Sequence, residues 1–176
     1  RYAQMSALAA IGDKRASKYL QNWTNSENWL DRYNAVDALG NLADEDSLPA
    51  ILRLLKDPHP KVRENAILSS GYFDSPKLRE RLLELLEEDD ISVVAAAVYM
   101  LGEFKASEAI PALLDLLKCE DEEILILVLE SLAKIRNKET VNYIIPLLNH
   151  PSPNVIKTVI ETLELFDPSD YFEGVV

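Results

Sequence analysis

The stretch Val62–Leu86, with the sequence V-R-E-N-A-I-L-S-S-G-Y-F-D-S-P-K-L-R-E-R-L-L-E-L-L, decides the fold. Each half places apolar or small residues three and four positions apart, which is the spacing of one helix face. These positions are Val62, Ala66, Ile67 and Ser70 in the first half, and Leu78, Leu82, Leu83, Leu85 and Leu86 in the second. Between them, Gly71 can cap the first helix and Pro76 can open the second, so we predict a helix, a turn and a helix.

This helix pair recurs along the chain with a step of 31 residues, as the glycines at positions 40, 71 and 102 show. A second column holds leucine pairs, at 54–55, 85–86, 116–117 and 147–148. A third column is apolar: Met5, Val36, Ile67, Val98, Leu129 and Ile160. A two-helix segment of this length cannot bury its apolar faces alone, whereas stacked neighbours can. The sequence therefore predicts an all-α protein built as an α-solenoid.

Two units show the full pattern, Asp31–Gly40 with Leu48–Leu55 and Val93–Gly102 with Ile110–Leu117. Each reads roughly V-R-x-x-A-x-x-A-L-G, then a turn, then I-P-A-L-L-x-L-L. This pattern resembles the short HEAT repeat, also called the phycobilisome-lyase HEAT-like repeat, over essentially the whole chain. The resemblance implies a right-handed superhelix of about five to six stacked HEAT-like helix pairs. It says little about function, because such arrays serve many unrelated tasks.

Length and composition narrow the classes of protein. The 176 residues suffice for a sizeable core, and we expect one elongated domain over residues 1–176. A formal charge of −12, from 30 acidic and 18 basic residues, disfavours nucleic acid as a partner. The single cysteine, Cys119, cannot form an internal disulfide, which favours a cytoplasmic location. We expect no membrane association, because no apolar run has the length of a membrane span.

The two ends of the chain fall inside repeat units. In repeat register Arg1 aligns with Arg32 and Arg63, within a first helix, and Tyr171–Val176 aligns with the start of a second helix. We therefore expect a fragment of a longer protein, with truncated first and last helices and with further domains of the same polypeptide among its partners.

The first helix of each pair carries the candidate binding surface. In proteins that this chain resembles, these helices line the concave side of the superhelix, where partners usually dock. The outward columns and the turn after one first helix predict these partner-binding residues: Tyr33, Asp37, Glu64, Leu68, Tyr72, Tyr99 and Ile126. We expect the five apolar and aromatic members to be exposed, and tyrosine buries a large area at low entropy cost. The alternative is that some of these side chains pack against neighbouring units.

Two charged patterns have structural interpretations. The resemblance implies that Arg32 and Arg63 pair with acids of neighbouring repeats and form a ladder. Their column turns apolar in the next three units, at Val94, Leu125 and Ile156, where we expect dry stacking or an apolar strip that a missing segment or partner covers. The acidic turns 87–90 and 120–123 are interpreted as solvated segments. They place negative charge at the start of the following helix, where the helix dipole favours it. Attraction of a basic partner or a cation is the alternative.

Candidate catalytic and metal-binding residues are few. The two histidines, His59 and His150, lie in proline-flanked turns, and Cys119 shares a repeat column with His150. Adjacent repeats stack about 10 Å apart, which is too far for a joint zinc site without further ligands. Ser69 and Ser70 indicate small residues at a tight helix crossing. No phosphate loop, H-E-x-x-H motif or nucleophile elbow is present, so we predict no cofactor, metal or catalytic residue.

These observations favour a non-catalytic interaction or scaffold module that binds a protein or peptide, of unknown identity, on its concave face. A bilin lyase or isomerase subunit is the second hypothesis, and it rests on the family resemblance alone. A nucleic-acid-binding HEAT-like domain ranks last, because the lysines and arginines scatter instead of forming a basic groove.

Overall fold

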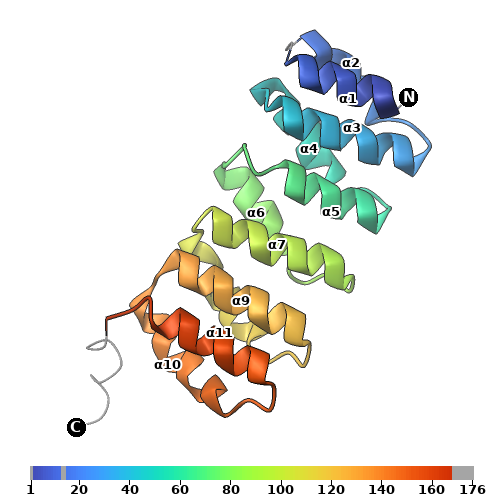
Figure 1. The fold of residues 1–176 in the computed structure, drawn as a ribbon. Helices are drawn as coiled ribbons and strands as arrows, with labels where there is room; N and C mark the ends of the chain where they lie inside the picture. Colours follow the sequence, from blue (N-terminus) through green and yellow to red (C-terminus); the bar gives the residue numbers. More distant parts are fainter. Residues whose placement is uncertain (1, 13–14, 168–176) are drawn as a thin grey trace. The chain divides into compact units, whose positions relative to one another are not determined.

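The computed structural model describes residues 2–12 and 15–167, and every regular element in this part of the chain is a helix (Figure 1). The α-helices are α1 (Tyr2–Ile11), α2 (Arg15–Trp23), α3 (Trp29–Leu42), α4 (Leu48–Leu54), α5 (Pro60–Ser69), α6 (Pro76–Leu85), α7 (Ile91–Glu103), α8 (Ile110–Leu116), α9 (Glu122–Ile135), α10 (Val141–Ile144) and α11 (Pro153–Leu163). Four 3₁₀ segments adjoin the second helices, η1 (Glu45–Ser47), η2 (Ser107–Ala109), η3 (Lys138–Thr140) and η4 (Ile145–Asn149). The predicted all-α solenoid of helix pairs is confirmed.

The chain forms two compact units, residues 1–100 and residues 101–176. In the first unit the helices α1, α3 and α5 lie side by side, with α2, α4 and α6 behind them (Figure 1). In the second unit α9 packs against α11. We call α1, α3, α5, α7, α9 and α11 the first helices, because each opens a predicted repeat. The expectation of one continuous domain over residues 1–176 stays a prediction.

The opening stretch folds as its pattern predicts. Val62, Ala66 and Ile67 are buried on α5, and Leu78, Leu82 and Leu85 are buried on α6. Ser75 caps α6, since its hydroxyl accepts a hydrogen bond from the Leu78 N–H at 3.3 Å, and proline follows at the first helical position. This arrangement satisfies a helix-end donor that would otherwise lack a partner.

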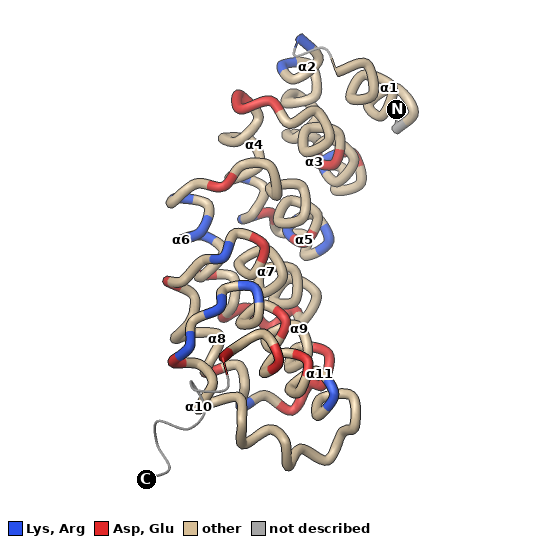
Figure 2. Tube along the Cα trace, turned by 60° about the vertical axis from the view of Figure 1, so that its left-hand side comes forward, with Lys and Arg blue, Asp and Glu red and all other residues tan. Residues whose placement is uncertain are grey.

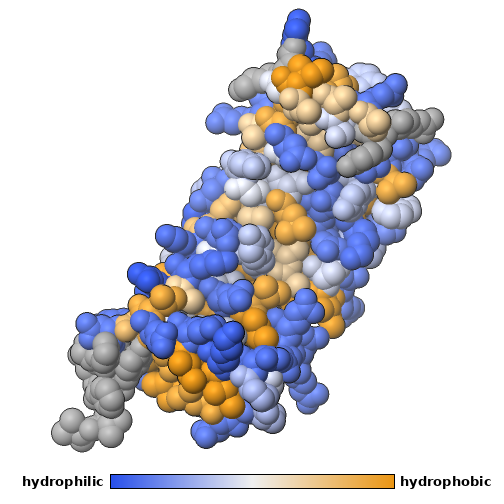
Figure 3. Space-filling model, in the orientation of Figure 1, coloured by the Kyte–Doolittle hydropathy of each residue, from blue (hydrophilic) through white to orange (hydrophobic). Residues whose placement is uncertain are grey.

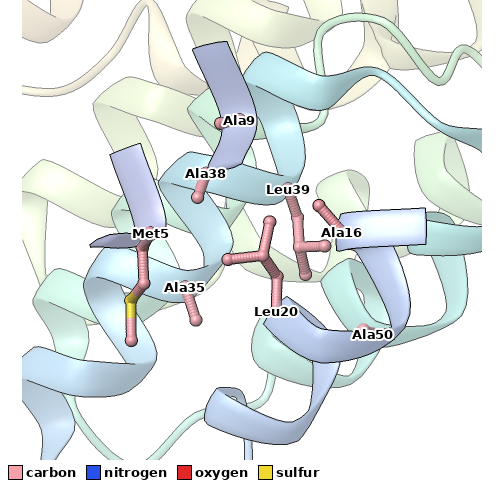
Figure 4. Close-up of a cluster of buried hydrophobic side chains, with 8 residues drawn as sticks. All are labelled: Met5, Ala9, Ala16, Leu20, Ala35, Ala38, Leu39 and Ala50. Atoms are coloured by element: carbon pink, nitrogen blue, oxygen red, sulfur yellow. The ribbon is translucent and has the colours of Figure 1, made fainter. Parts of the chain in front are cut away.

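Small residues dominate the core cluster formed by α1 to α4 in the first unit. Eight buried side chains from α1 to α4 meet there (Figure 4): Met5, Ala9, Ala16, Leu20, Ala35, Ala38, Leu39 and Ala50. Five of the eight are alanines, so the helix backbones approach closely while the larger side chains fill the space between them. Trp23, which occupies a leucine column, is only partly buried and packs against this cluster.

Two members of the glycine column, Gly40 and Gly102, serve close helix packing rather than helix capping. Gly40 lies within α3 and Gly102 within α7, and a Cβ at Gly40 would lie 2.6 Å from the Ser69 Cβ and 2.8 Å from the Ser69 carbonyl oxygen. A Cβ at Gly102 would meet Ser131 equally closely, at 2.6 Å from its Oγ. The interpretation of Ser69 as a small residue at a tight crossing is therefore confirmed. The expected capping role of Gly71 is wrong, because this residue does not adopt the left-handed conformation.

Left-handed residues instead end the helices three positions after the glycine column. Gly12, Ala43, Lys105 and Arg136 all have positive φ, between 49° and 68°. The Ala43 N–H donates to the carbonyls of Leu39 and Gly40, which satisfies free acceptors at the end of α3. A left-handed conformation costs a residue with a Cβ about 1 kcal/mol or more.

We therefore expect Ala43→Gly to raise the free energy of unfolding by about 0.5 kcal/mol, since relief of left-handed strain exceeds the added chain entropy of glycine. The measurement is the urea midpoint followed by circular dichroism. The matched control is Ala95→Gly inside α7, where the same change should lower stability by about 1 kcal/mol. Destabilisation by Ala43→Gly would contradict the strain argument.

Candidate partner-binding site

The first helices of the N-terminal unit expose large apolar side chains at equivalent repeat positions. Leu68 on α5 is 47% exposed and Tyr99 on α7 is 39% exposed, one repeat apart in sequence. Tyr72 lies on the turn after α5 and is 75% exposed. Figure 3 shows hydrophobic surface at the level of α5 and α7 between hydrophilic neighbours. These three residues, which we call the Leu68 patch, are candidates for contact with a partner.

Tyr33 is less exposed than its position in the pattern suggests. Its ring is half-buried and lies edge-on to Trp29, with centroids 6.4 Å apart and an interplanar angle of 83°. Trp29 in turn stacks on His59, with centroids 4.0 Å apart and planes 9° apart. The expectation that Tyr33 is an exposed aromatic is therefore wrong, because intramolecular aromatic packing occupies part of its surface.

The two acidic members of the predicted site differ in environment. Asp37 is half-buried on α3, and burial raises the pKa of its carboxyl group. Glu64 on α5 accepts a hydrogen bond from Lys61 at 2.7 Å, an i,i+3 pair on one helix. Such exposed pairs contribute little to stability. Lys61 therefore compensates the charge of Glu64 only in part.

Arg32 links two successive turns of the array. Its guanidinium donates two hydrogen bonds to the Asp57 carboxylate, at 2.6 and 2.8 Å, and another to the Ser26 carbonyl at 2.8 Å. The Asp57 carboxylate also accepts from the His59 N–H at 2.9 Å. Burial by itself would raise the pKa of Asp57, but the hydrogen bonds from Arg32 and His59 outweigh it and hold that pKa below its ordinary value. Asp57 is thereby kept ionised beside a partly buried cation.

Arg63 repeats this arrangement one unit later. It donates to the Asp57 carbonyl at 2.9 Å and to the Glu88 carboxylate at 2.7 Å. Asp57 therefore serves both arginines, one through its side chain and the other through its backbone. These contacts are those that the ladder hypothesis requires, and its energetic role stays a prediction.

The acceptor column of the ladder changes together with the arginine column. Asp57 and Glu88 align with Cys119 and His150 in the next two repeats, where the arginine column reads Val94 and Leu125. Val94 and Leu125 are both buried, as expected for dry contacts. The sequence alone could have indicated this change, because each of these repeats that lacks the arginine also lacks the acid.

The acidic turns have local structural roles. Asp121 accepts a hydrogen bond from the Ile124 N–H at 3.0 Å and caps α9, and Asp90 accepts from the Ser92 N–H at 3.1 Å at the start of α7. The positive end of the helix dipole also stabilises carboxylates at these helix starts. The interpretation of the turns as solvated helix-start segments accounts for these contacts.

The described residues offer no group of three or more histidine, cysteine or acidic side chains placed to hold a metal ion. Burial raises the pKa of the Cys119 thiol, which lowers its thiolate fraction at neutral pH. His150 accepts a hydrogen bond from the Ser152 N–H at 3.1 Å. Across the same described ranges, 2–12 and 15–167, none of the helices combines the length and the apolar character that crossing a membrane requires.

Ile126 lies in the second unit and is half-buried, so the expectation of an exposed side chain is wrong there too. It lines a cavity of about 370 Å³ on the outward face of α9, together with Leu127 and three glutamates. A second cavity, of about 480 Å³, lies where the C-terminal halves of α9 and α11 meet, and Glu130 lines both. The first cavity is lined by α9 alone and includes the predicted residue Ile126. Sequence reasoning missed the second cavity, because its lining comes from α9, α11 and the turn after α7.

A comparison with known protein families matches HEAT repeats at residues 1–59, 48–125 and 110–173. The chain therefore belongs to the HEAT-repeat family, whose solenoid fold is typical of protein-interaction scaffolds. A comparison with curated proteins gives no match.

Several solved structures share the fold. One is the complex of CpcE and CpcF of phycocyanin lyase from Nostoc sp. PCC7120, with a TM-score of 0.75 and 23% identity over 88% of this chain, which spans 66% of that chain. A second is a designed armadillo repeat protein in complex with the peptide (KR)4, with a TM-score of 0.69 and 17% identity over 94% of this chain and 91% of that chain. A third is human deoxyhypusine hydroxylase in complex with glycerol, with a TM-score of 0.52 and 15% identity over 93% of this chain and 78% of that chain. At these identities the likeness concerns the fold alone.

Proposed function

We propose that this chain is a non-catalytic interaction or scaffold module, which binds a protein or peptide segment on the face of its first helices. The observation that carries the proposal is the exposure of Leu68 and Tyr99 at the same repeat position of α5 and α7. Large apolar and aromatic side chains on rigid helices lose little entropy on binding, so they make efficient anchors for a partner. Tyr72 extends this exposed set.

Two further observations support the proposal. The fold is shared with a designed armadillo repeat protein that was solved with a bound peptide. Cys119 as the single cysteine supports a reducing, cytoplasmic location. We also propose that further domains of the same polypeptide are among its partners.

Leu68→Ala/Tyr99→Ala is expected to weaken partner binding about ten-fold or more, because truncating two central anchors removes their buried area. The measurement is a pull-down from the native lysate with mass spectrometry, followed by titration of the retained protein. Tyr33 stays intact in this variant, since its contact with Trp29 contributes to the fold.

The matched control is Tyr143→Ala, which removes a similarly exposed aromatic from α10, a second helix. Its binding should equal that of the wild type. Equal retention of one protein by the wild type and by Leu68→Ala/Tyr99→Ala would place the contact elsewhere and refute the site. Retention of no protein by either would favour a structural spacer.

A bilin lyase or isomerase subunit remains the second candidate function. The fold likeness to the CpcE and CpcF complex favours it, and at 23% identity that likeness does not extend to activity. A nucleic-acid-binding domain ranks last, because a formal charge of −12 repels phosphate backbones.

A further inference from the structure

Two adjoining hollows lie along the outward face of α9 within the second unit, and together we call them the α9 groove. Ile126 and Leu127 supply the apolar lining of its first cavity, of about 370 Å³. Ala133 of α9 and Leu165, just after α11, line the second cavity, of about 480 Å³. Glu130 lines both cavities, so the two adjoin along the helix.

Unbalanced charges of opposite sign mark the two ends of this groove. Glu123 and Glu130 line the first cavity, and within residues 2–12 and 15–167 neither carboxylate has a cation partner. Lys105 and Arg136 line the second cavity, and neither side chain has an acidic partner within those ranges. Figure 2 shows red acidic positions on α9 and α11.

The other charged groups around the groove have hydrogen-bond or ion-pair partners, and two of them pair with a group of opposite charge. Lys134 donates to Glu103 at 2.6 Å, and Glu161 lies 3.6 Å from Lys157. Glu122 accepts a hydrogen bond from Asn154 at 2.9 Å. The net field along the groove is therefore negative at the start of α9 and positive at its end.

The helix dipole explains only part of this arrangement. It favours acids at the start of α9 and the cation at its end. It does not explain Glu130, which lies in the interior of the helix, or Lys105, which the turn after α7 contributes to the same cavity. Both residues add to the polarity of the groove itself.

We propose that this groove binds an extended peptide segment that carries a basic residue at one end and an acidic residue about six residues away, with apolar side chains between them. From position 123 to position 136 there are 13 helical steps, or about 20 Å at 1.5 Å each. An extended peptide covers that length in about six residues. This inference rests on the proposed interaction function and states the chemistry of a partner segment.

Each part of the segment has a counterpart in the groove. The basic residue lies near Glu123 and Glu130, with its aliphatic stem along Ile126. The apolar side chains occupy the two cavities, and the acidic residue meets Lys105 and Arg136. A segment with like charges at both ends meets repulsion at one end, so charge order sets the specificity.

The test uses the full chain labelled with ¹⁵N and four synthetic probes, the acetylated and amidated peptides K-A-L-A-L-A-E, E-A-L-A-L-A-K, K-A-L-A-L-A-K and E-A-L-A-L-A-E. One of the two mixed-charge peptides should bind at least about five-fold tighter than both like-charged peptides. Its amide shifts should concentrate on α9 and on the C-terminal half of α11. The better of the two mixed orders assigns the direction of the chain in the groove.

Charge reversal sharpens the test. Glu123→Lys/Glu130→Lys should weaken binding of the mixed-charge peptide about five-fold or more and should strengthen binding of E-A-L-A-L-A-E. Lys105→Glu/Arg136→Glu should weaken binding of the same mixed-charge peptide and should instead strengthen binding of K-A-L-A-L-A-K. The matched control is Lys77→Glu on α6, an exposed charge reversal outside the groove that should leave all four affinities unchanged.

Three results overturn the proposal. These are equal affinity for all four peptides, amide shifts outside α9 and α11, and the same α9 shifts on concentrating the protein alone, which would assign the groove to a second copy of this chain. If the peptides fail while the pull-down retains a protein that depends on Leu68 and Tyr99, only this inference is lost. If the pull-down fails as well, the proposed function is lost with it.

Discussion

Gly40→Ala is expected to lower the free energy of unfolding by about 2 kcal/mol or more, with a fall in Tm of at least about 4 °C. The added Cβ would lie 2.6 Å from the Ser69 Cβ and 2.8 Å from the Ser69 carbonyl oxygen. The backbone of α5 cannot yield as a flexible side chain does, so α3 and α5 must separate. Alanine gains about 1 kcal/mol in helix propensity over glycine, and the clash has to exceed that gain.

Gly71→Ala is the matched control, because it makes the same change at the same repeat position. Its Cβ would meet the Met100 Cε at 3.5 Å, which is ordinary contact with the end of a flexible side chain. We expect a change within about 0.5 kcal/mol. Gly102→Ala should repeat the large loss, since the Ser131 Cα would lie 2.9 Å away. Thermal and urea melts measure all three variants, and equal stability of Gly40→Ala and Gly71→Ala would refute the crossing argument.

Asp57→Asn is expected to lower stability by about 3 kcal/mol at neutral pH, since it leaves the Arg32 guanidinium partly buried without its countercharge. The Asp57 and Arg32 side chains are only 3% and 12% exposed. Glu88→Gln removes the equivalent acid from the next arginine–acid pair, Arg63 and Glu88. Glu88 is 28% exposed and accepts one hydrogen bond from Arg63, so about 1 kcal/mol is expected there.

The effect of Asp57 depends on pH in a defined direction. Because its pKa is lowered in the folded protein, its stabilisation is complete above the ordinary aspartate pKa of about 3.9 and is lost as the pH falls through the lowered value. The stability difference between wild type and Asp57→Asn should therefore be constant from pH 7 to about pH 5 and shrink under more acidic conditions. Urea titrations at a series of pH values measure this, and a difference that grows on acidification would contradict the assignment.

Much of the fold followed from the sequence because repetition multiplies a weak signal. A single column such as Met5, Val36 and Ile67 indicates one helix face, and three columns in one register indicate stacked pairs. The close approach at Ser69 was also predictable, since small residues at a helix crossing have few other uses. The glycine column was not, because capping and close approach both select glycine, and only the contact with Ser69 distinguishes them.

The candidate site was predictable as a face but not residue by residue. Leu68 and Tyr99 are exposed as their columns predict, whereas Tyr33 depends on the orientation of Trp29, which no spacing records. The groove on α9 needs side chains from α9, α11 and the turn after α7 to converge. Such convergence is a property of tertiary packing, and a periodic pattern carries no information about it.

The double use of Asp57 has a consequence for how the first unit comes apart. Its carboxylate holds Arg32 and its carbonyl holds Arg63, so displacing this one turn releases both rungs. In a linear array, contacts shared between neighbours raise the free energy of a boundary between folded and unfolded repeats. We therefore expect the helix pairs on either side of Asp57 to unfold together as a single cooperative block, and not one pair at a time.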